Sequence, residues 1–335
     1  MPHEMSRQRP PRPADPRFGP GVTNGVPVAE EPSWNAPSGA PPEQPFHHLD
    51  SLWVQVAGTL CNLACTHCFV TCGPHEERHA MMSRAEVQGR VAEGLALGVK
   101  EVYLTGGEPF LNPQAELIIE DTLAHAPVTV LTNGTLLTER RVTWLAALSR
   151  RARFALELRV SLDGTDAATH DAFRGAGAWL RTMAGLRMLS GAGLLPIVTV
   201  TQLASPASGP ASGPAAQDAR AFTERCAAML RAEGVRTPRL KLLPMFKLGR
   251  EAERSGGYAA QATLATLPPE AFDPHRLQCG SCRAVTSRGV YVCPLLVDEP
   301  GGRMADTLAG SARPFALTHG ACVTCWVTGM SCANG

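Results

Sequence analysis

Six short apolar segments recur along this chain and alternate with stretches of helical periodicity. They read SLWVQVAG (51–58), KEVYLTGG (100–107), PVTVLTNG (127–134), ALELRVSLDG (155–164), LPIVTVTQ (195–202) and PRLKLLPMF (238–246). Strands that alternate with helices at this spacing form a parallel sheet with right-handed crossovers. The pattern predicts an α/β fold, and it leaves open whether the six units form an open doubly wound sheet or a partial barrel.

The segments between these strands carry helix signals. Residues 83–86 read SRAE, a capping box that predicts a helix beginning at Ser83. Leu180, Met183, Leu186 and Leu189 recur at helical spacing within 178–190. We expect the other helices at 115–126, 137–151 and about 217–233.

The composition of the chain limits which binding partners and which cellular compartment we expect. The chain has 335 residues and a net charge of +1, which gives no electrostatic reason to expect a nucleic acid or an anionic membrane as partner. No stretch approaches the ~20 apolar residues of a membrane span. The polar N-terminus lacks the apolar region of a secretory signal. We therefore expect a cytoplasmic protein, in which thiols stay reduced.

Two segments have a biased composition. Residues 1–45 hold 12 of the 28 prolines and few apolar residues, which predicts a disordered arm. The stretch ASPASGPASGPAAQ at 204–217 predicts a flexible insertion. These features divide the chain into the arm, a core domain at 46–250 that contains the insertion, and a cysteine-rich C-terminal region at 251–335.

The eleven cysteines fall into two groups. Four lie at 61–72, Cys226 stands alone, and six lie between 279 and 332. An odd number argues against complete disulfide pairing, and groups at both ends of a cytosolic chain favour metal or cluster ligation. The first group begins CNLACTHC at 61–68. With Cys72 it offers the four ligands of structural zinc, whereas three thiolates alone suit a 4Fe-4S cluster that keeps one iron open.

The first cysteine motif resembles the signature of radical S-adenosylmethionine (radical SAM) enzymes. The similarity continues, in order, through LTGGEPFLNP, LTNG, VSLDG with the later HDAFRG, and LKLLPMFKLGR, each at or after one of the expected strands. The resemblance implies a partial (β/α)6 TIM-like barrel. Its site is expected at the C-terminal ends of the strands, as in other parallel barrels.

The resemblance also implies cofactors. Cys61, Cys65 and Cys68 are expected to hold a 4Fe-4S cluster, with S-adenosylmethionine (SAM) chelating the fourth iron. One electron would then cleave SAM to a 5′-deoxyadenosyl radical, which abstracts hydrogen from the substrate. The electron would come from a low-potential donor such as flavodoxin or ferredoxin.

Further residues are expected, by the same resemblance, to line the SAM pocket. Two glycines would allow close approach to the methionyl amino group, a glutamate would accept a hydrogen bond there, and an aspartate and an arginine would serve the ribose and the carboxylate. This set comprises Gly106, Gly107, Glu108, Pro109, Asn133, Ser161, Asp163 and Arg174. Several of these types are also ordinary turn residues after strands. His67 is expected to pack near the adenine, Cys72 to be a spare thiol, and Cys226 to be a small buried hydrophobe.

The second cysteine group resembles the SPASM/twitch extension of peptide-modifying radical SAM enzymes, although a zinc ribbon is the alternative. Its candidate metal ligands are Cys279, Cys282, Cys293, Cys322, Cys325 and Cys332. The full pattern binds two further clusters with seven cysteines. Here the spacing from Gly289 to Cys293 is one residue short, and no cysteine follows Cys332. We therefore expect one or two auxiliary 4Fe-4S clusters, either two with three thiolates each or one fully ligated.

These features predict a radical SAM oxidoreductase that modifies a peptide or a small metabolite. The alternatives are a tetrapyrrole-modifying enzyme of the same superfamily, or a non-catalytic zinc or iron-sulfur protein. The sequence does not single out a catalytic acid or base among its histidines, which include His75 and His79 just after the cysteine motif.

Overall fold

The computed structural model describes residues 40–201, 215–260, 262–266, 272–329 and 332–334. The expected disordered arm therefore lies outside the described residues except for 40–45. The expected insertion at 204–217 also lies outside them, except for 215–217, which begin a helix.

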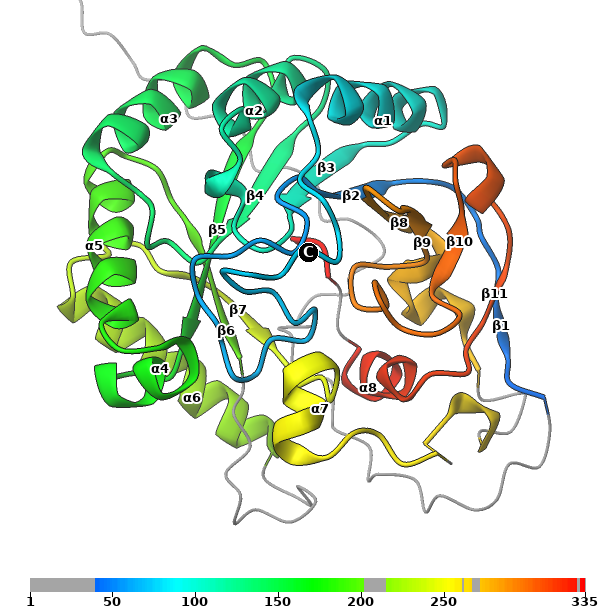
Figure 1. Cartoon of the computed structure of the whole chain (residues 1–335). Helices are drawn as coiled ribbons and strands as arrows, with labels where there is room; N and C mark the ends of the chain where they lie inside the picture. Colours follow the sequence, from blue (N-terminus) through cyan, green and yellow to red (C-terminus); the bar gives the residue numbers. More distant parts are fainter. Residues whose placement is uncertain (1–39, 202–214, 261, 267–271, 330–331, 335) are drawn as a thin grey trace, which may run out of the picture.

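A nine-stranded sheet forms the centre of the molecule (Figure 1). Six of its strands are parallel and lie side by side in chain order: β2 (Ser51–Gln55), β3 (Glu101–Thr105), β4 (Val128–Thr132), β5 (Leu156–Asp163), β6 (Ile197–Thr201) and β7 (Arg239–Leu243). In a doubly wound sheet the strand order would reverse near the middle. The unbroken order identifies a partial (β/α)6 barrel, as predicted.

Helices cover the outer face of the six strands (Figure 1). They are α1 (Arg84–Ala96), α2 (Ala115–Leu123), α3 (Glu139–Arg151), α4 (Ala167–Arg174), α5 (Ala178–Gly191) and α6 (Ala215–Ala232). The capping box at the start of α1 is present: the Ser83 side chain accepts from the Glu86 backbone, and the Glu86 carboxylate accepts from the Ser83 N–H. Helix α4 was not expected from the sequence.

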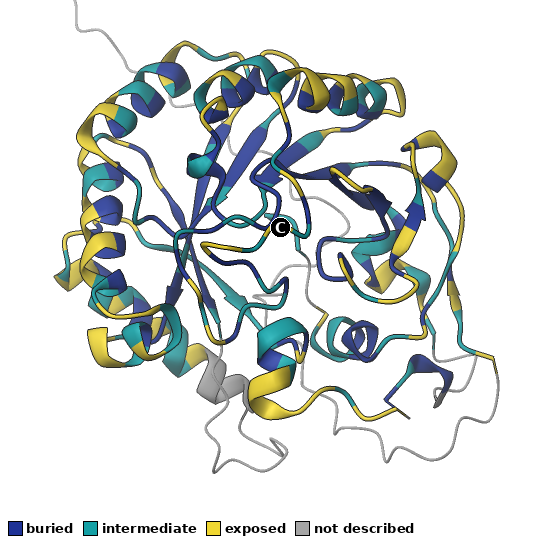
Figure 2. Ribbon diagram, viewed as in Figure 1, coloured by how far each residue is buried: buried dark blue, intermediate teal, exposed yellow. Residues whose placement is uncertain are grey.

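The two faces of the barrel wall differ in polarity because successive strand residues point to opposite sides. Residues such as Leu52, Val102 and Val130 pack in the main core between sheet and helices, which Figure 2 shows as buried. The alternate residues at the middle of the strands face the barrel interior. Trp53, Tyr103 and Thr129 are register partners, Thr199 pairs with Lys241, and the Arg159 side chain reaches Thr199 through a hydrogen bond. We call this set the inner layer; it comprises Trp53, Tyr103, Thr129, Arg159, Thr199 and Lys241.

The C-terminal region extends the same sheet. Strand β8 (Cys282–Thr286) pairs in parallel with β2, and β9 (Gly289–Tyr291) and β10 (Arg303–Ala305) follow antiparallel. A separate two-stranded sheet joins β1 (Glu43–Gln44) to β11 (Phe315–Ala316). Helices α7 (Gly249–Ser255) and α8 (Gly320–Thr328) lie beside the open edge of the barrel (Figure 1). The cysteine-rich region is thus built onto the barrel wall.

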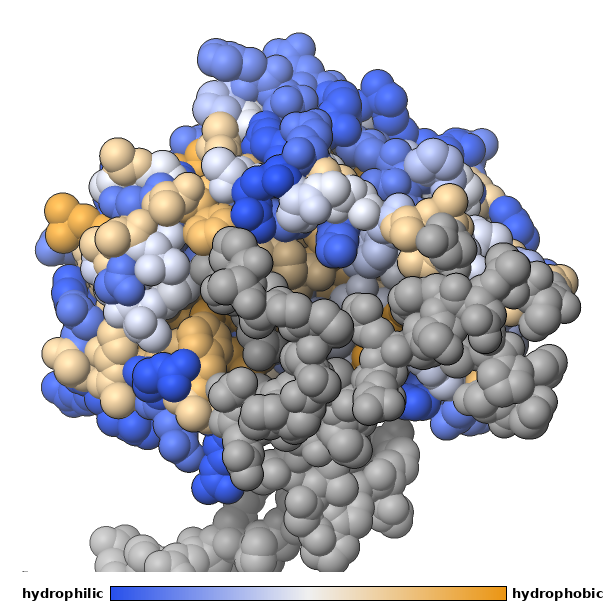
Figure 3. All heavy atoms as spheres, turned by 90° about the horizontal axis from the view of Figure 1, so that it is seen from below, coloured by the Kyte–Doolittle hydropathy of each residue, from blue (hydrophilic) through white to orange (hydrophobic). Residues whose placement is uncertain are grey.

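The surface carries few large exposed apolar side chains among the described residues. They are Leu97, Leu117, Leu180 and Leu195. Seen from below, hydrophilic residues spread over the face and hydrophobic residues lie in smaller groups between them (Figure 3). Within the described part of the chain, no helix has the length and apolarity to cross a membrane.

Candidate functional site

The first three cysteines lie in the long loop between β2 and α1, at the C-terminal ends of the parallel strands. Backbone hydrogen bonds fold the loop onto itself: the Cys61 N–H donates to the Gly73 carbonyl (3.0 Å) and the Cys68 N–H to the Cys65 carbonyl (3.3 Å). Cys61, Cys65 and Cys68 share one small packed cluster with Cys72. The structure therefore brings the three predicted ligands together, and it places the fourth thiol beside them.

Cys72 contacts one of the predicted ligands directly. Its backbone N–H donates to the Cys68 sulfur at 3.3 Å, and hydrogen bonding with the Cys72 thiol lowers the pKa of the Cys68 thiol. Burial instead raises the pKa of Cys61, to about 12, and that of Cys65. The loop thus holds one thiol that ionises readily next to two that need a cation to do so.

Gly106 and Gly107 press against the cysteine loop. The Gly107 N–H donates to the Gly58 carbonyl at 2.9 Å, and a Cβ at Gly107 would lie 2.0 Å from the Leu60 carbonyl oxygen. Gly106 has a φ of +122°, a conformation that favours glycine. The glycines therefore let the loop approach β3 closely, a reason for their presence that the sequence had not suggested. Pro109 fixes the following turn at the first position of a short 3-10 helix.

Glu108 is fully buried behind these glycines. Its carboxylate accepts hydrogen bonds from the Phe110 N–H (3.2 Å), the Thr132 hydroxyl (2.8 Å) and the Asn133 N–H (2.8 Å). Burial raises its pKa to about 7 despite these donors. The predicted partner of the SAM amino group is thus already tied to the end of β4.

Asn133 connects the end of β4 to the cysteine loop. Its side-chain amide nitrogen donates to the side-chain amide oxygen (Oδ1) of Asn62 at 2.9 Å and lies 3.8 Å from the Cys61 sulfur. Its own amide oxygen accepts from the Thr135 N–H and hydroxyl, which fixes the amide orientation. Asn133 therefore holds the first cysteine in place from the neighbouring strand.

Asp163, His67 and Arg174 form a buried charged group at the end of β5. The Asp163 carboxylate lies 3.0 Å from His67 Nε2 and 2.5 Å from Arg174 Nε. Burial alone would raise the pKa of Asp163, but Arg174 and His67 outweigh it and hold that pKa well below its usual range. Asp163 Oδ1 and His67 Nδ1 are buried without a hydrogen-bond partner. Ser161 precedes this group on the same face of β5.

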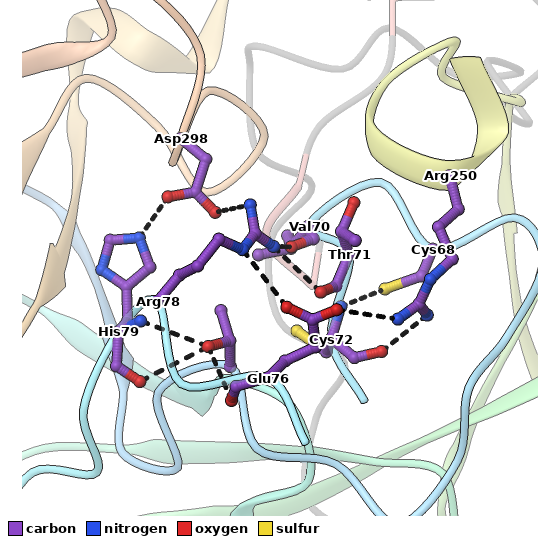
Figure 4. A network of polar contacts seen from close by, with 10 residues as sticks. Cys68, Val70, Thr71, Cys72, Glu76, Arg78, His79, Arg250 and Asp298 are labelled. Carbon is purple, nitrogen blue, oxygen red and sulfur yellow. Dashed lines mark hydrogen bonds and ion pairs between the residues drawn. The ribbon is translucent and has the colours of Figure 1, made fainter. Parts of the chain in front are cut away.

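Arg250, at the start of α7, holds the cysteine loop from the opposite side (Figure 4). Its backbone N–H donates to the Cys68 carbonyl, and its guanidinium donates to the carbonyls of Cys65 (3.3 Å) and Cys72 (2.7 Å). The sequence motif LKLLPMFKLGR contains this arginine, but no role followed from the motif alone. The arginine could be read from the sequence, but its contacts with the cysteine loop are seen only in the fold.

Arg78 and His79 join the same loop to the C-terminal region (Figure 4). Arg78 donates to the carbonyls of Val70 and Thr71 and pairs with Asp298 at 3.1 Å. His79, which is fully buried, also contacts the Asp298 carboxylate. Asp298 lies between β9 and β10, so one carboxylate links the two cysteine-bearing parts of the chain.

The six C-terminal cysteines line one cavity. They come from the segment before β8, the turn after β9, helix α8 and the 332–334 segment, and the lining is completed by apolar residues such as Val292, Leu295 and Phe315. Burial raises the pKa of each of the six thiols. The six cysteines share one largely apolar cavity, which suits a metal group that binds thiolates.

Three cations bind the backbone of segments next to this cavity. Arg283 donates to the carbonyls of Cys279 (2.8 Å) and Cys282 (2.7 Å), Arg159 donates to the Cys332 carbonyl (2.6 Å), and Lys241 donates to the Ala333 carbonyl. The 332–334 segment reaches the inner layer of the barrel, where its Asn334 also bonds Tyr103 and Thr129. Figure 1 shows this segment in red near the middle of the molecule.

The residues of the first loop fit a 4Fe-4S cluster with a bound polar cofactor. Three cysteine thiols supply the donors, and Arg174 and Arg250 oppose the rise that burial causes in the pKa of Cys65. The unpartnered Asp163 Oδ1 and His67 Nδ1 leave buried polar atoms for a ligand to satisfy. Cys226, by contrast, lies fully buried in the main core, as expected for a small hydrophobe.

Comparison with known proteins agrees with this site. Residues 56–204 match the family described as the radical SAM superfamily. An AdoMet-dependent heme synthase of Methanosarcina barkeri is 38% identical over 142 residues, 41% of this chain and 38% of that protein. The mycofactocin maturase MftC of Mycobacterium ulcerans is 33% identical over 134 residues, 40% of this chain and 34% of that protein. The match thus spans less than two fifths of either relative.

A solved structure extends the similarity of fold beyond the matched domain. Streptococcus suis SuiB, bound to its precursor peptide SuiA, superposes with a TM-score of 0.57 at 14% identity, covering 80% of this chain and 65% of that one. This likeness concerns the fold alone. With the cysteine loop, the barrel and the family match in agreement, residues 56–204 form a radical SAM domain.

Proposed function

We propose that this protein is a radical SAM oxidoreductase that modifies a peptide. The observation that carries the proposal is the three-cysteine loop at the C-terminal ends of the parallel strands, held by Asn133 on one side and Arg250 on the other. When bound, the cluster and SAM supply a 5′-deoxyadenosyl radical, formed by one-electron cleavage of the sulfonium, that takes a hydrogen atom from the substrate.

The protein's own residues bind and orient these groups. Cys61, Cys65 and Cys68 would hold the cluster. Asn133 holds the side chains of Asn62 and Cys61, and Arg250 binds the loop backbone, so the three thiols would keep one arrangement. The buried Asp163 and His67 retain an unsatisfied oxygen and nitrogen that would meet polar atoms of SAM, while Arg174 keeps Asp163 ionised. Gly106, Gly107, Glu108, Pro109 and Ser161 complete the proposed pocket.

We propose one auxiliary 4Fe-4S cluster in the C-terminal region. All six cysteines line a single cavity, which supports one site more readily than two separate ones. Four thiolates would close the cluster and two would remain as neighbours. A closed cluster suits electron transfer, so it would accept the electron that leaves the substrate radical when the product is oxidised.

A peptide substrate is the first choice between the possible substrates. MftC is named a maturase, and SuiB is seen with a precursor peptide. The heme synthase relative makes a tetrapyrrole the second candidate. We further propose that flavodoxin or ferredoxin delivers the electron for SAM cleavage and that the protein works in the cytoplasm, where thiols stay reduced.

Anaerobic reconstitution tests the enzyme proposal. The full chain should bind about eight iron atoms, four for each cluster, and release 5′-deoxyadenosine when given SAM and dithionite. The Cys61→Ala, Cys65→Ala, Cys68→Ala triple variant should lose the product and about half of the iron. Stoichiometric zinc without 5′-deoxyadenosine would instead identify a zinc protein.

The substrate is tested with isotope. A short peptide encoded beside this gene, deuterated at its candidate residues, should transfer deuterium into 5′-deoxyadenosine. Transfer from a deuterated tetrapyrrole precursor in its place would favour the second candidate.

A further inference from the structure

Arg159, Lys241 and Arg283 share an unusual setting. Arg159 is 4% exposed and Arg283 1% exposed, and Lys241 is partly buried in the barrel interior. A buried charge is costly unless it is paired with an opposite charge.

The direct partners of these cations are neutral. Within the described part of the chain, Arg159 donates to the Thr199 hydroxyl and the Cys332 carbonyl, and Lys241 donates to the Ala333 carbonyl. Arg283 donates to the carbonyls of Cys279, Cys282, Ser311 and Arg313. Carbonyl oxygens satisfy the hydrogen bonds, but they do not cancel the charge.

The cations instead bind the backbone next to the six-cysteine cavity. Four of the carbonyls that they bind belong to cysteines or to the residue next to one, in two separate segments, one with Cys279 and Cys282 and the other with Cys332. Arg159 and Lys241 come from β5 and β7 of the barrel, whereas Arg283 comes from β8. Two independent parts of the fold therefore direct positive charge to one cavity.

We propose that Arg159, Lys241 and Arg283 supply the counter-charge for an anionic iron-sulfur cluster in this cavity and set its reduction potential. This inference rests on the auxiliary cluster proposed above. A cluster bound by four thiolates carries net negative charge and becomes more negative on reduction. Because the cations lie in a low-dielectric surrounding, they stabilise the reduced form more than the oxidised one.

The test measures the midpoint potential of the auxiliary cluster in the full chain. The Cys61→Ala, Cys65→Ala, Cys68→Ala background removes the signal of the first cluster. In it, Arg159→Gln and Lys241→Met should each move the potential to more negative values, and Arg159→Lys should keep it near the parent value. Arg303→Gln is the control for charge, because Arg303 is half exposed and solvent screens it.

A second control distinguishes the loss of a positive charge from the loss of a hydrogen bond that holds residues 332–334. Tyr103→Phe removes the acceptor of the Asn334 N–H and leaves all three cations in place, so it should leave the potential near the parent value. An unchanged potential in both charge-removing variants would overturn the inference. So would an equal shift in Tyr103→Phe or Arg303→Gln.

If a variant does not assemble the auxiliary cluster, its potential cannot be measured, and its iron content is measured in place of the potential. Loss of auxiliary iron from Arg159→Gln and Lys241→Met with retention in Arg159→Lys supports the counter-charge, whereas loss from all three overturns it. If the background variant binds no auxiliary iron, the inference and the auxiliary cluster both fail. SAM cleavage by the unmodified chain would still stand as the test of the first cluster.

Discussion

The two cysteine-bearing regions of this molecule differ in what surrounds their thiols. Around the first loop, cations and carboxylates are mixed, and Asp163 and His67 keep polar atoms that no protein group satisfies. Around the second, cations bind neutral carbonyls and the cavity lining is apolar apart from the cysteines and Gln278. The first surrounding suits a site that exchanges a polar cofactor, and the second suits a centre that holds charge without binding substrate.

Removing cysteines from the C-terminal region should separate its role in product formation from SAM cleavage at the first loop. Cys279→Ala with Cys322→Ala and Cys325→Ala leaves three of the six thiols, fewer than the four that the cluster needs, so it should remove the auxiliary iron and abolish product formation, because the substrate electron then has no acceptor. The same variant should still release 5′-deoxyadenosine from SAM, measured by chromatography. Loss of SAM cleavage would break the comparison, since it would make the second region necessary for the first.

Gly107→Ala should disturb the first region strongly. The new Cβ would lie 2.0 Å from the Leu60 carbonyl oxygen and force the cysteine loop away from β3. We expect a loss of about 3 kcal/mol in the free energy of unfolding, with a fall of more than tenfold in SAM cleavage. Gly89→Ala in α1 is the matched control, since nothing lies within 4 Å of its Cβ, and it should stabilise by about 0.5–1 kcal/mol.

Glu108 should give the first region a pH dependence. Its pKa is about 7 when folded against 4.5 for the free group, so the folded protein binds more protons between these values. Its contribution to stability is present below pH 4.5 and is lost as the pH rises through about 7, by about 3 kcal/mol in all. Urea unfolding of the apoprotein should show this slope, and Glu108→Gln should flatten it. A slope equal in both proteins would assign it to other groups.

Cys72→Ala should have the smallest effect. The thiol lies beside Cys68 but is expected not to bind iron, so the iron content and SAM cleavage should stay near those of the parent protein. A cost of about 1 kcal/mol from the small cavity is expected in unfolding experiments. Loss of four irons would show that Cys72 is a ligand and that the first region is closed like the second.

Local patterns predicted the strands of the barrel, whereas the barrel itself was implied by the resemblance to radical SAM enzymes. All six strands, the Ser83 capping box and the position of the first motif at the strand ends follow from periodicity and short-range signals. Parallel strands in chain order then leave few alternatives. The ligand roles in the SAM pocket remain predictions.

Contacts between distant segments escaped the sequence. The pairing of β8 with β2 joins residues more than 200 positions apart, and the link from His79 to Asp298 is of the same kind. Neither has a local signal, because strand β8 begins within a cysteine pattern and a lone aspartate looks like a turn residue. Arg159 and Lys241 each lie among the apolar residues of an expected strand. These two charged residues were the sequence feature that could have indicated a polar barrel interior.

The position of residues 332–334 limits how a substrate chain could pass through the barrel. These residues occupy its middle and are bonded to β3, β4, β5 and β7, so a chain cannot thread along the barrel axis without displacing them. The proposed peptide substrate would then enter and leave by the same mouth, beside the cysteine loop, and would present its reacting residue as a bend or a free end.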